Sequence, residues 1–280
     1  TETQRTLYRR LPIMLTTNND ANTVANKPVW VPSTIQGGCS RLSIWRQGDR
    51  LFVRKQPTEA VQYLCETEAL SILCGHPHVV NMLSHGRGVL FVEYCQGGDL
   101  FDLIKAKGAL RPNYCRQIIS EICSALVAAK QKQIFHRDIK LENVFLDKHG
   151  KVKLGDWGLS SFRSHSNVLR GTLSSIAPEL VSGDGRTAHD LEKADTWALG
   201  VVLFTIFFGR PPYETPQVKG NAEKGRYLEC DPFLRMILEK KWEAFWRYQN
   251  RLCDGTNADV KRLLESMLSV DPNERPTFEN

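Results

Sequence analysis

The sequence has no C-x-x-C pair, although it contains eight cysteines. These cysteines stand at positions 39, 65, 74, 95, 115, 123, 230 and 253, several of them in apolar stretches. Closely spaced cysteine pairs are typical of zinc sites and redox motifs, and disulfide frameworks are typical of small secreted domains. We therefore expect reduced thiols and neither a zinc-binding nor a disulfide-stapled fold.

Long apolar runs are also missing. No stretch is long enough to cross a bilayer, and the first thirty residues contain no signal-peptide core. The balance of 37 basic and 31 acidic residues gives a mild net charge of +6, and no basic patch typical of nucleic-acid binding stands out. These absences predict an intracellular protein, cytoplasmic or nuclear, with no membrane or nucleic-acid partner.

The length of the chain favours two lobes. A chain of 280 residues exceeds the usual single core, and its hydrophobic fraction of 41% is ample for burial. Residues 1–28 are polar and read as an extension, whereas 29–95 and 96–280 read as the small and large lobes of one catalytic domain. The last helix of that domain is expected to be incomplete.

The apolar periodicity predicts most of the secondary structure. Three antiparallel strands are expected between Val29 and Lys55, with a hairpin turn at Gln47-Gly48-Asp49. The further predicted strands are Val79 to Leu83 and Val89 to Tyr94; the predicted helices are 59 to 74, Leu100 to Lys105, Pro112 to Gln131, Ala194 to Phe208, Pro232 to Arg247 and Ala258 to Leu268. Gln96-Gly97-Gly98 forms a hinge between the lobes. This order predicts an α+β fold with a five-stranded antiparallel lobe, one main helix beside it, and a larger helical lobe.

The run from His136 to Asn143 carries the chemical signal. Asp138 and Asn143 bracket a tight loop, which brings a hydroxyl-orienting carboxylate and a metal-binding amide to one centre. Asp156 follows thirteen residues after Asn143, a spacing that leaves room for a β-hairpin to return it to the same place. Taken singly, an Asp in a polar loop or an Asn near a strand is better explained as a turn former or a cap than as a catalytic residue. Their combined order predicts phosphoryl transfer.

With these residues in view, the chain resembles a eukaryotic-type serine/threonine protein kinase of the calcium/calmodulin-kinase or SNF1-like kind. The resemblance runs from about Val29 to the end of the sequence. It rests on Ile134 to Asp147 as the catalytic loop, Asp156-Trp157-Gly158 as the metal-binding triplet and Ala177-Pro178-Glu179 as the end of the activation segment. The resemblance also pairs Arg275 with Glu179.

The resemblance implies a nucleotide site for ATP. Lys55 ends the third strand and would bind the α- and β-phosphates, with Glu66 of the following helix as its partner and Glu68 as the alternative. Backbone groups of Glu93 and Cys95 would bind the adenine edge, and Val92 would control the depth behind it. Val53 and Phe145 would sandwich the adenine ring, and Gly37 and Gly38 would cover the phosphates. Asp99 would either lie near the ribose or cap the next helix.

The resemblance also implies the catalytic and metal residues. Asp138 would orient the incoming hydroxyl, and Lys140 would lie near the transferred group. Asn143 and Asp156 would hold Mg²⁺, with Mn²⁺ as the alternative ion. Thr172 after Gly171, together with Lys140, is typical of serine/threonine enzymes.

The implied partners are protein substrates with a Ser or Thr acceptor, and the implied assembly is a monomeric catalytic domain. Glu142 and Asp99 stand where basophilic relatives place acids that receive upstream arginines, so we predict a preference for basic residues before the acceptor. A plain surface charge explains Glu142 equally well.

Three departures from the family pattern bear on function. The segment Ile35 to Leu42 offers two glycines where three spaced ones are expected, which predicts an altered phosphate cover. Trp157 replaces the usual phenylalanine, is predicted to pack with Leu70, Met82 and His136, and needs a partner for its indole N–H. The phosphorylatable threonine before Gly171 is missing, which predicts activity without phosphate, with Ser164 or Ser166 as fallback sites.

Two other classes of function stay open. A pseudokinase scaffold that binds nucleotide without turnover is suggested by the irregular glycine loop. A small-molecule kinase would share the hinged architecture but gives no reason for the Ala-Pro-Glu segment or for the pairing of Arg275.

Overall fold

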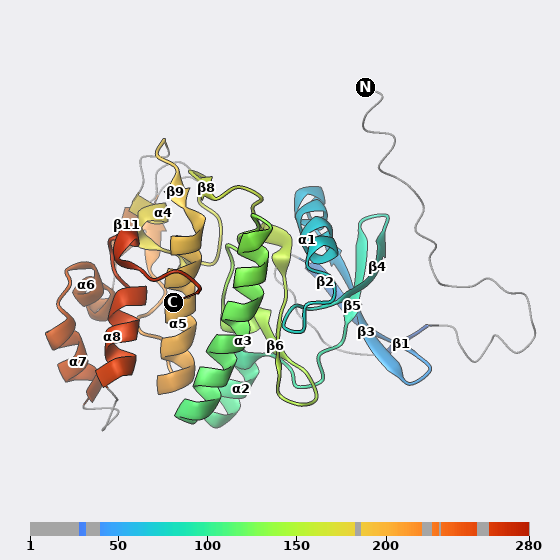
Figure 1. Cartoon of the computed structure of the whole chain (residues 1–280), viewed down its shortest axis with the longest axis horizontal. Helices are drawn as coiled ribbons and strands as arrows, with labels where there is room; N and C mark the ends of the chain where they lie inside the picture. The colour runs from blue at the N-terminus through green and yellow to red at the C-terminus, as the bar shows by residue number, and fades with distance from the viewer. Residues whose placement is uncertain are drawn as a thin grey trace, which may run out of the picture.

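The computed structural model describes residues 28–31, 40–182, 186–219, 226–229, 231–250 and 258–279. A sheet with one helix beside it lies at one end of the molecule, and a larger body, made mostly of helices, makes up the rest (Figure 1). The predicted two-lobed α+β fold is confirmed. No helix within the described ranges is both long and apolar enough to span a membrane.

The small lobe is a five-stranded antiparallel sheet in the order β1-β2-β3-β5-β4. Its strands are β1 (Val29–Val31), β2 (Ser40–Gln47), β3 (Arg50–Pro57), β4 (Met82–Gly86) and β5 (Val89–Glu93). Gly48 has a φ of 57° between β2 and β3, which confirms the predicted hairpin turn. The prediction of a strand from Val79 was wrong, because that segment bonds to the large lobe instead and the strand begins only at Met82.

Helix α1 (Ala60–Ile72) packs beside the sheet. Its Glu66 side chain is buried. Ala69 and Leu70 on the same face are buried, as the spacing predicted. Val61 and Leu64, which belong to the same apolar series, are instead 51% and 57% exposed. The spacing therefore predicted the helix correctly, but only part of the apolar series faces the core.

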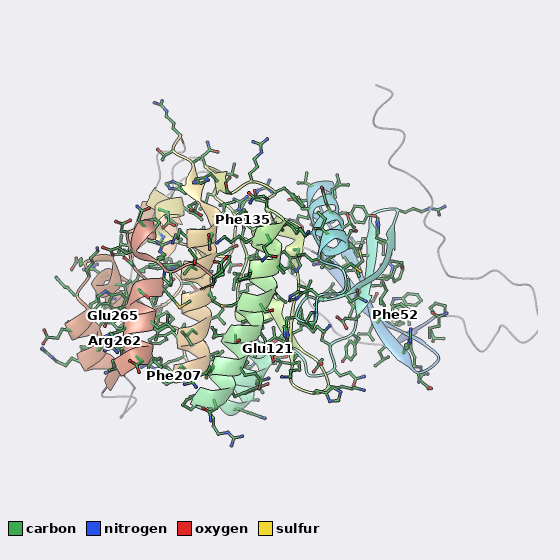
Figure 2. All side chains as sticks on the ribbon, in the orientation of Figure 1. Phe52, Glu121, Phe135, Phe207, Arg262 and Glu265 are labelled. Carbon is green, nitrogen blue, oxygen red and sulfur yellow. The ribbon has the colours of Figure 1, made fainter. Side chains whose placement is uncertain are left out.

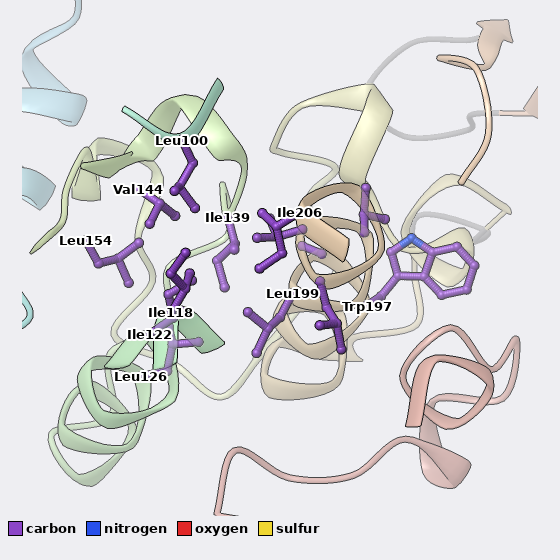
Figure 3. Packing of buried hydrophobic residues seen from close by; sticks show 14 of the residues in the cluster. Leu100, Ile118, Ile122, Leu126, Ile139, Val144, Leu154, Trp197, Leu199 and Ile206 are labelled. Atoms are coloured by element: carbon purple, nitrogen blue, oxygen red, sulfur yellow. The ribbon is translucent and has the colours of Figure 1, made fainter. Parts of the chain in front are cut away.

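The large lobe is built on α3 (Pro112–Gln131), α5 (Leu191–Phe208) and α8 (Ala258–Met267), which lie side by side (Figure 1). Figure 3 shows Ile118, Ile122 and Leu126 of α3 beside Leu199 and Ile206 of α5, and all five side chains are buried. Nearly every residue of α5 is buried, which explains its continuous apolar sequence. This helix is the centre of the lobe.

The remaining helices of this lobe are shorter. They are α2 (Leu100–Lys107), α4 (Pro178–Ser182), α6 (Pro232–Leu238) and α7 (Trp242–Asn250). The prediction of one helix from Pro232 to Arg247 was wrong. Lys240 adopts a left-handed φ of 55°, and the Lys241 N–H donates to the Met236 carbonyl at 2.8 Å, a Schellman-type ending that separates α6 from α7.

Three two-stranded pairs complete the large lobe. β6 (Val144–Leu146) pairs with β7 (Val152–Leu154), β8 (His165–Ser166) with β9 (His189–Asp190), and β10 (Gln217–Lys219) with β11 (Arg226–Glu229). The β6–β7 hairpin is held to α3 by Glu121, whose Oε2 accepts the Val152 N–H at 2.8 Å (Figure 2). This attachment fixes the hairpin that carries the predicted metal ligands.

Candidate active site

The catalytic loop is anchored from below by Asp195 of α5. The backbone N–H groups of His136 and Arg137 each donate to one oxygen of that carboxylate at 2.8 Å. Burial raises the pKa of Asp195 to about 7, while these two bonds act in the opposite direction. Arg137 holds a left-handed φ of 66° within this anchored turn. A strained backbone conformation is thus fixed to the most buried helix of the lobe.

Asp138 lies at the centre of a hydrogen-bonded group. Its Oδ1 accepts from the Thr172 hydroxyl at 2.7 Å, and its Oδ2 lies 3.0 Å from Lys140 Nζ and accepts from Asn143 Nδ2 at 3.0 Å. Lys140 Nζ also donates to Thr172 Oγ1 at 2.8 Å. The structure therefore brings together four residues that the sequence nominated, and it holds the Asp138 carboxylate in one orientation.

Asp156 returns to this loop through the β6–β7 hairpin. The Gly155 N–H donates to the Asn143 carbonyl at 2.9 Å, and Asp156 itself has a left-handed φ of 57°. Although burial alone raises the pKa of Asp156, the adjacent Lys55 ammonium lowers it below its ordinary value, so this carboxyl is ionised. The predicted hairpin is confirmed by the register of β6 and β7.

Asn143 and Asp156 fit a hard divalent ion by their donor chemistry. Asn143 gives its Nδ2 to the backbone oxygen of Asp138 at 2.7 Å, which leaves the amide oxygen as its ligating atom. The side chain of Asp156 is 44% exposed and negatively charged. The described residues contain no cluster of three His, Cys, Asp or Glu side chains for a metal. Such a pair of oxygen ligands suits an ion that takes its other ligands from phosphate and water.

Lys55 projects from β3 toward both lobes. Its Nζ lies 2.8 Å from Glu66 Oε1 on α1 and 2.7 Å from Asp156 Oδ1. Burial alone lowers the pKa of Lys55, but the two carboxylates outweigh it and raise that pKa. The structure places Glu66 beside Lys55, whereas Glu68 is exposed on the outer face of α1. Glu66 is therefore the ion-pair partner.

The predicted adenine residues lie at the junction of the lobes. Val53 and Val92 are cross-strand neighbours in β3 and β5, and Phe145 of β6 forms an isolated backbone bridge with Asp99. Asp99 also caps α2, since its Oδ1 accepts the Asp102 N–H at 2.9 Å. The capping role of Asp99 is confirmed, and its ribose contact remains a prediction.

Of the other predicted nucleotide-binding residues, the structure describes Glu93 and Cys95. Glu93 ends β5, and Cys95 is a free thiol just after it, with its pKa raised to about 12 mainly by burial. Gly37 and Gly38 lie outside the described residues.

Trp157 is fully buried directly behind the metal-binding turn. Its ring lies 4.5 Å from the ring of His136, centroid to centroid, and its Nε1 donates to the Leu154 carbonyl at 3.3 Å. Leu70 belongs to the same buried cluster, and Met82 packs against it. His136 is also fully buried, with Nε2 3.0 Å from the Gly155 carbonyl, so it is a structural residue.

The activation segment is held by backbone contacts. Arg137 donates from Nη2 to the Val168 carbonyl at 2.6 Å. Strands β8 and β9 pair, and the Leu191 N–H donates to the Ser164 carbonyl at 2.9 Å. At the end of the segment, Glu179 forms two 2.7 Å hydrogen bonds with the guanidinium of Arg275. The predicted pairing is therefore confirmed.

Comparison with known proteins decides the family. The protein kinase domain model matches residues 52–280, which is most of the chain. The chain belongs to the protein kinase family. Its relatives include serine/threonine kinases, and we assign the chain to the eukaryotic-type serine/threonine branch.

Three relatives illustrate the similarity. The kinase domain is 33% identical over 218 residues to a probable myosin light chain kinase of Dictyostelium discoideum, 30% over 223 to the phosphorylase b kinase gamma catalytic chain, liver/testis isoform, of Bos taurus, and 30% over 217 to CBL-interacting serine/threonine-protein kinase 20 of Arabidopsis thaliana. These alignments cover 74%, 76% and 74% of this chain, but only 41%, 51% and 44% of the relatives. The chain thus spans about half the length of these relatives.

Membership in the family implies ATP as the phosphate donor, a divalent metal ion and a protein acceptor. One residue that holds the site in place was missed by sequence reasoning. Asp195 was expected only as part of a buried helix, yet its carboxylate accepts the backbone N–H groups of His136 and Arg137. The signal that could have identified Asp195 is a charged residue within an otherwise apolar helix, because a buried charge needs a hydrogen-bonding partner.

Proposed function

We propose that this protein transfers the γ-phosphate of ATP to serine or threonine hydroxyls of protein substrates, as a monomeric catalytic domain acting inside the cell, in cytoplasm or nucleus. The observation that carries the proposal is the convergence of Lys55, Asp138, Asn143 and Asp156 at the junction of the lobes, where the Gly155 N–H, next to Asp156, donates to the Asn143 carbonyl at 2.9 Å. Lys55 Nζ and Asp156 Oδ1 lie 2.7 Å apart, and Asn143 Nδ2 and Asp138 Oδ2 lie 3.0 Å apart. Positioning and charge neutralisation are the main demands of phosphoryl transfer.

In the proposed mechanism, Asp138 orients the acceptor hydroxyl and takes its proton late in the reaction. Lys140 and Thr172 both bind the Asp138 carboxylate and keep it facing the acceptor. Lys55, held by Glu66, binds the α- and β-phosphates. We propose Mg²⁺, with Mn²⁺ as an alternative, held by Asn143 and Asp156; the ion supplies the positive charge that neutralises the phosphates.

The proposed adenine site uses groups from both lobes. Val53 and Phe145 enclose the ring from opposite lobes, the backbone of Glu93 and Cys95 binds its edge, and Val92 limits the depth. We expect Gly37 and Gly38 to cover the phosphates, and Asp99, the N-cap of α2, to bind the ribose. Apolar contact and backbone hydrogen bonds together are typical of nucleotide pockets.

The substrate preference that we propose is basic. Burial raises the pKa of Asp99, and the nearby carboxylates of Asp102 and Glu142 raise it further. A group of carboxylates of this kind favours arginine or lysine on the N-terminal side of the acceptor. Profiling on a peptide array tests this: enrichment of acidic or proline-directed sites contradicts it.

The decisive experiment is a phosphate-transfer assay with ATP, magnesium and a mixed peptide library. Asp138→Ala is expected to lower the turnover rate at least about a hundredfold, because the acceptor hydroxyl loses the base that orients it. ATP binding, measured by calorimetry, is expected to persist in the variant, since Lys55 and Asp156 are unchanged. Asp259→Ala, at an exposed position of α8, is the control and is expected to retain turnover.

The alternative is a scaffold that binds nucleotide without turnover, as suggested by the glycine spacing at 35–42. The complete set of charged residues argues against this alternative. Turnover by the wild-type chain that is lost in Asp138→Ala excludes the scaffold, whereas nucleotide binding without turnover would establish it.

A further inference from the structure

The sheet of the small lobe has a face that points away from α1. Lys55 of β3 points to the other face, where it pairs with Glu66 of α1. Side chains alternate between the two faces along a strand, so Phe52 and Arg54 point away from α1. Strands β1, β2 and β3 lie at the end of the molecule opposite α6, α7 and α8 (Figure 1). The face of these strands away from α1 is called the outer face below.

Three aromatic side chains form a row across the outer face. Trp30 of β1 is the cross-strand neighbour of Trp45 of β2, and Trp45 is the neighbour of Phe52 of β3. Cross-strand neighbours point to the same face of a sheet. Phe52 is buried and contacts the ring of Phe91 with the centroids 5.9 Å apart, whereas Trp30 is 54% exposed. The row therefore ends in an indole that is open to solvent.

Three arginines surround this row. Arg50 and Arg54 each stand two residues from Phe52 in β3, so both point to the outer face. Arg41 of β2 is the cross-strand neighbour of Gln56, which accepts a hydrogen bond from Arg54 at 3.2 Å on the same face. Arg41 and Arg50 are exposed. Within the part of the chain that the structure describes, none of the three arginines has a carboxylate partner, so their charge can be neutralised by an anionic ligand.

The arrangement of these groups favours an extended ligand that carries both negative charges and planar rings. Arg41 and Arg50 lie at opposite ends of the row, about 20 Å apart along the strands. Exposed aromatic rings beside basic side chains are the features with which sheet surfaces bind single-stranded nucleic acid, because unpaired bases stack on the rings and phosphates bind the cations. An acidic peptide would neutralise the arginines but would not need the exposed indole of Trp30.

We propose that the outer face binds single-stranded nucleic acid, with bases stacked on Trp30 and Trp45 and phosphates bound by Arg41, Arg50 and Arg54. These arginines are separated in the sequence and are brought together only by the pairing of β2 with β3, which explains why no basic patch was predicted. The proposal does not depend on the proposed kinase activity. Because Lys55 lies on the opposite face of the sheet, the bound strand leaves the ATP site open.

The test is the fluorescence anisotropy of a labelled oligothymidylate of about twelve nucleotides, titrated with the full chain at several salt concentrations. The logarithm of the wild-type binding constant is expected to fall with the logarithm of the salt concentration, with a slope of about −2 for three neutralised phosphates. Trp30→Ala is expected to weaken binding at least about fivefold, because one stacking surface is lost. Trp30→Phe keeps a ring and is expected to bind more tightly than Trp30→Ala, which separates stacking from damage to the fold.

A matched pair of arginine variants tests the choice of face. Arg50→Gln is expected to weaken binding and to make the salt slope less steep by about 0.7. Arg46→Gln removes another exposed arginine of the same hairpin, but Arg46 follows Trp45 directly and therefore points to the opposite face. It is expected to leave the slope unchanged. Equal effects of the two variants would mean that only the net charge of the protein matters and would overturn the proposal.

Two further probes separate nucleic acid from other polyanions. An abasic oligonucleotide of the same length has the phosphates without the bases, and polyglutamate has the charge without either. Both are expected to bind more weakly than oligothymidylate. Equal binding of the abasic strand overturns the role of stacking, and equal binding of polyglutamate indicates an acidic protein partner instead.

Competition with ATP and magnesium locates the bound strand. Saturating ATP is expected to leave the anisotropy unchanged, whereas displacement would place the strand at the phosphate-transfer site and overturn the proposal. Failure of the wild-type chain to bind oligothymidylate would also overturn it. Neither result changes the outcome of the phosphate-transfer assay, so the two proposals fail independently.

Discussion

At the scale of single residues, the most informative group is the buried carboxyl of Glu66. It is 2% exposed, and burial raises its pKa to about 7 from an ordinary 4.5, even though Lys55 attracts its charged form. Between these two values the folded state binds more protons than the unfolded state, so this group makes the protein less stable as pH rises.

This gives a prediction about the pH dependence of stability. The free energy of unfolding of the wild type minus that of Glu66→Gln is expected to fall as the pH rises from 4.5 to 7, because burial raises the pKa of Glu66 in the folded state. Urea denaturation at several pH values measures it. Glu68→Gln, at an exposed position of the same helix, is the control and is expected to show no such slope. A difference that rises with pH would contradict this assignment.

Arg275 gives a second prediction at this scale. Its guanidinium is fully buried and bonded to Glu179, so removing it leaves an unpaired carboxylate in the interior. Arg275→Met is expected to lower the free energy of unfolding by roughly 3 to 5 kcal/mol. Arg247→Met removes an exposed partner of Glu243 on α7, and its effect is expected to be several times smaller. Equal losses in the two denaturation curves would refute the role of burial.

At the scale of elements, the activation segment makes its own contacts with the catalytic loop and with the start of α5. Arg137, the residue expected to receive a phosphate on this segment, donates instead to the Val168 carbonyl. We therefore expect Ser164→Ala/Ser166→Ala to keep turnover within about twofold of wild type. Mass spectrometry of the active protein is expected to find residues 160–175 unmodified. A stoichiometric phosphate in this segment whose removal abolishes turnover would end this hypothesis.

Gly171 tests the close approach of this segment to the catalytic loop. It has a φ of +120°, and a Cβ there would lie 2.7 Å from the Arg137 carbonyl oxygen. Gly171→Ala is expected to reduce peptide turnover at least about tenfold, because backbone strain of this kind costs 1 to 3 kcal/mol or so and displaces Thr172. Gly86→Ala is the control, because a Cβ at that position would meet no atom within 4 Å apart from its chain neighbours. Unaltered turnover in Gly171→Ala would show that the segment tolerates displacement.

The elements also show where sequence reasoning succeeds. Helices α2, α3, α5 and α8 follow from strong apolar periodicity or continuous apolar runs. The start of β4 could not be predicted in this way, because Val79 and Val80 have the apolar sequence of a strand but are buried against the other lobe. The break between α6 and α7 was also missed, since a lysine in the left-handed region leaves no glycine or proline to mark it.

At the scale of the whole molecule, the candidate site was predictable where a motif orders its residues along the chain. Asp138, Lys140, Asn143 and Asp156 belong to this class. The contact of Asp195 with the catalytic loop was not predictable, because it depends on how α5 packs against that loop. Single-sequence patterns do not encode such pairings. The boundaries proposed at 29–95 and 96–280 remain predictions.

The bond between Lys55 Nζ and Asp156 Oδ1 has a consequence for how nucleotide and metal bind. These two groups, drawn from opposite lobes, neutralise each other where a triphosphate and its cation would otherwise do so. Binding of ATP and its metal ion therefore exchanges counter-ions: Lys55 leaves Asp156 for the phosphates, and the metal ion takes the place of Lys55 beside Asp156. A triphosphate arriving without its metal would free the Asp156 carboxylate with no cation to take its place, which makes joint arrival of the two the favoured route.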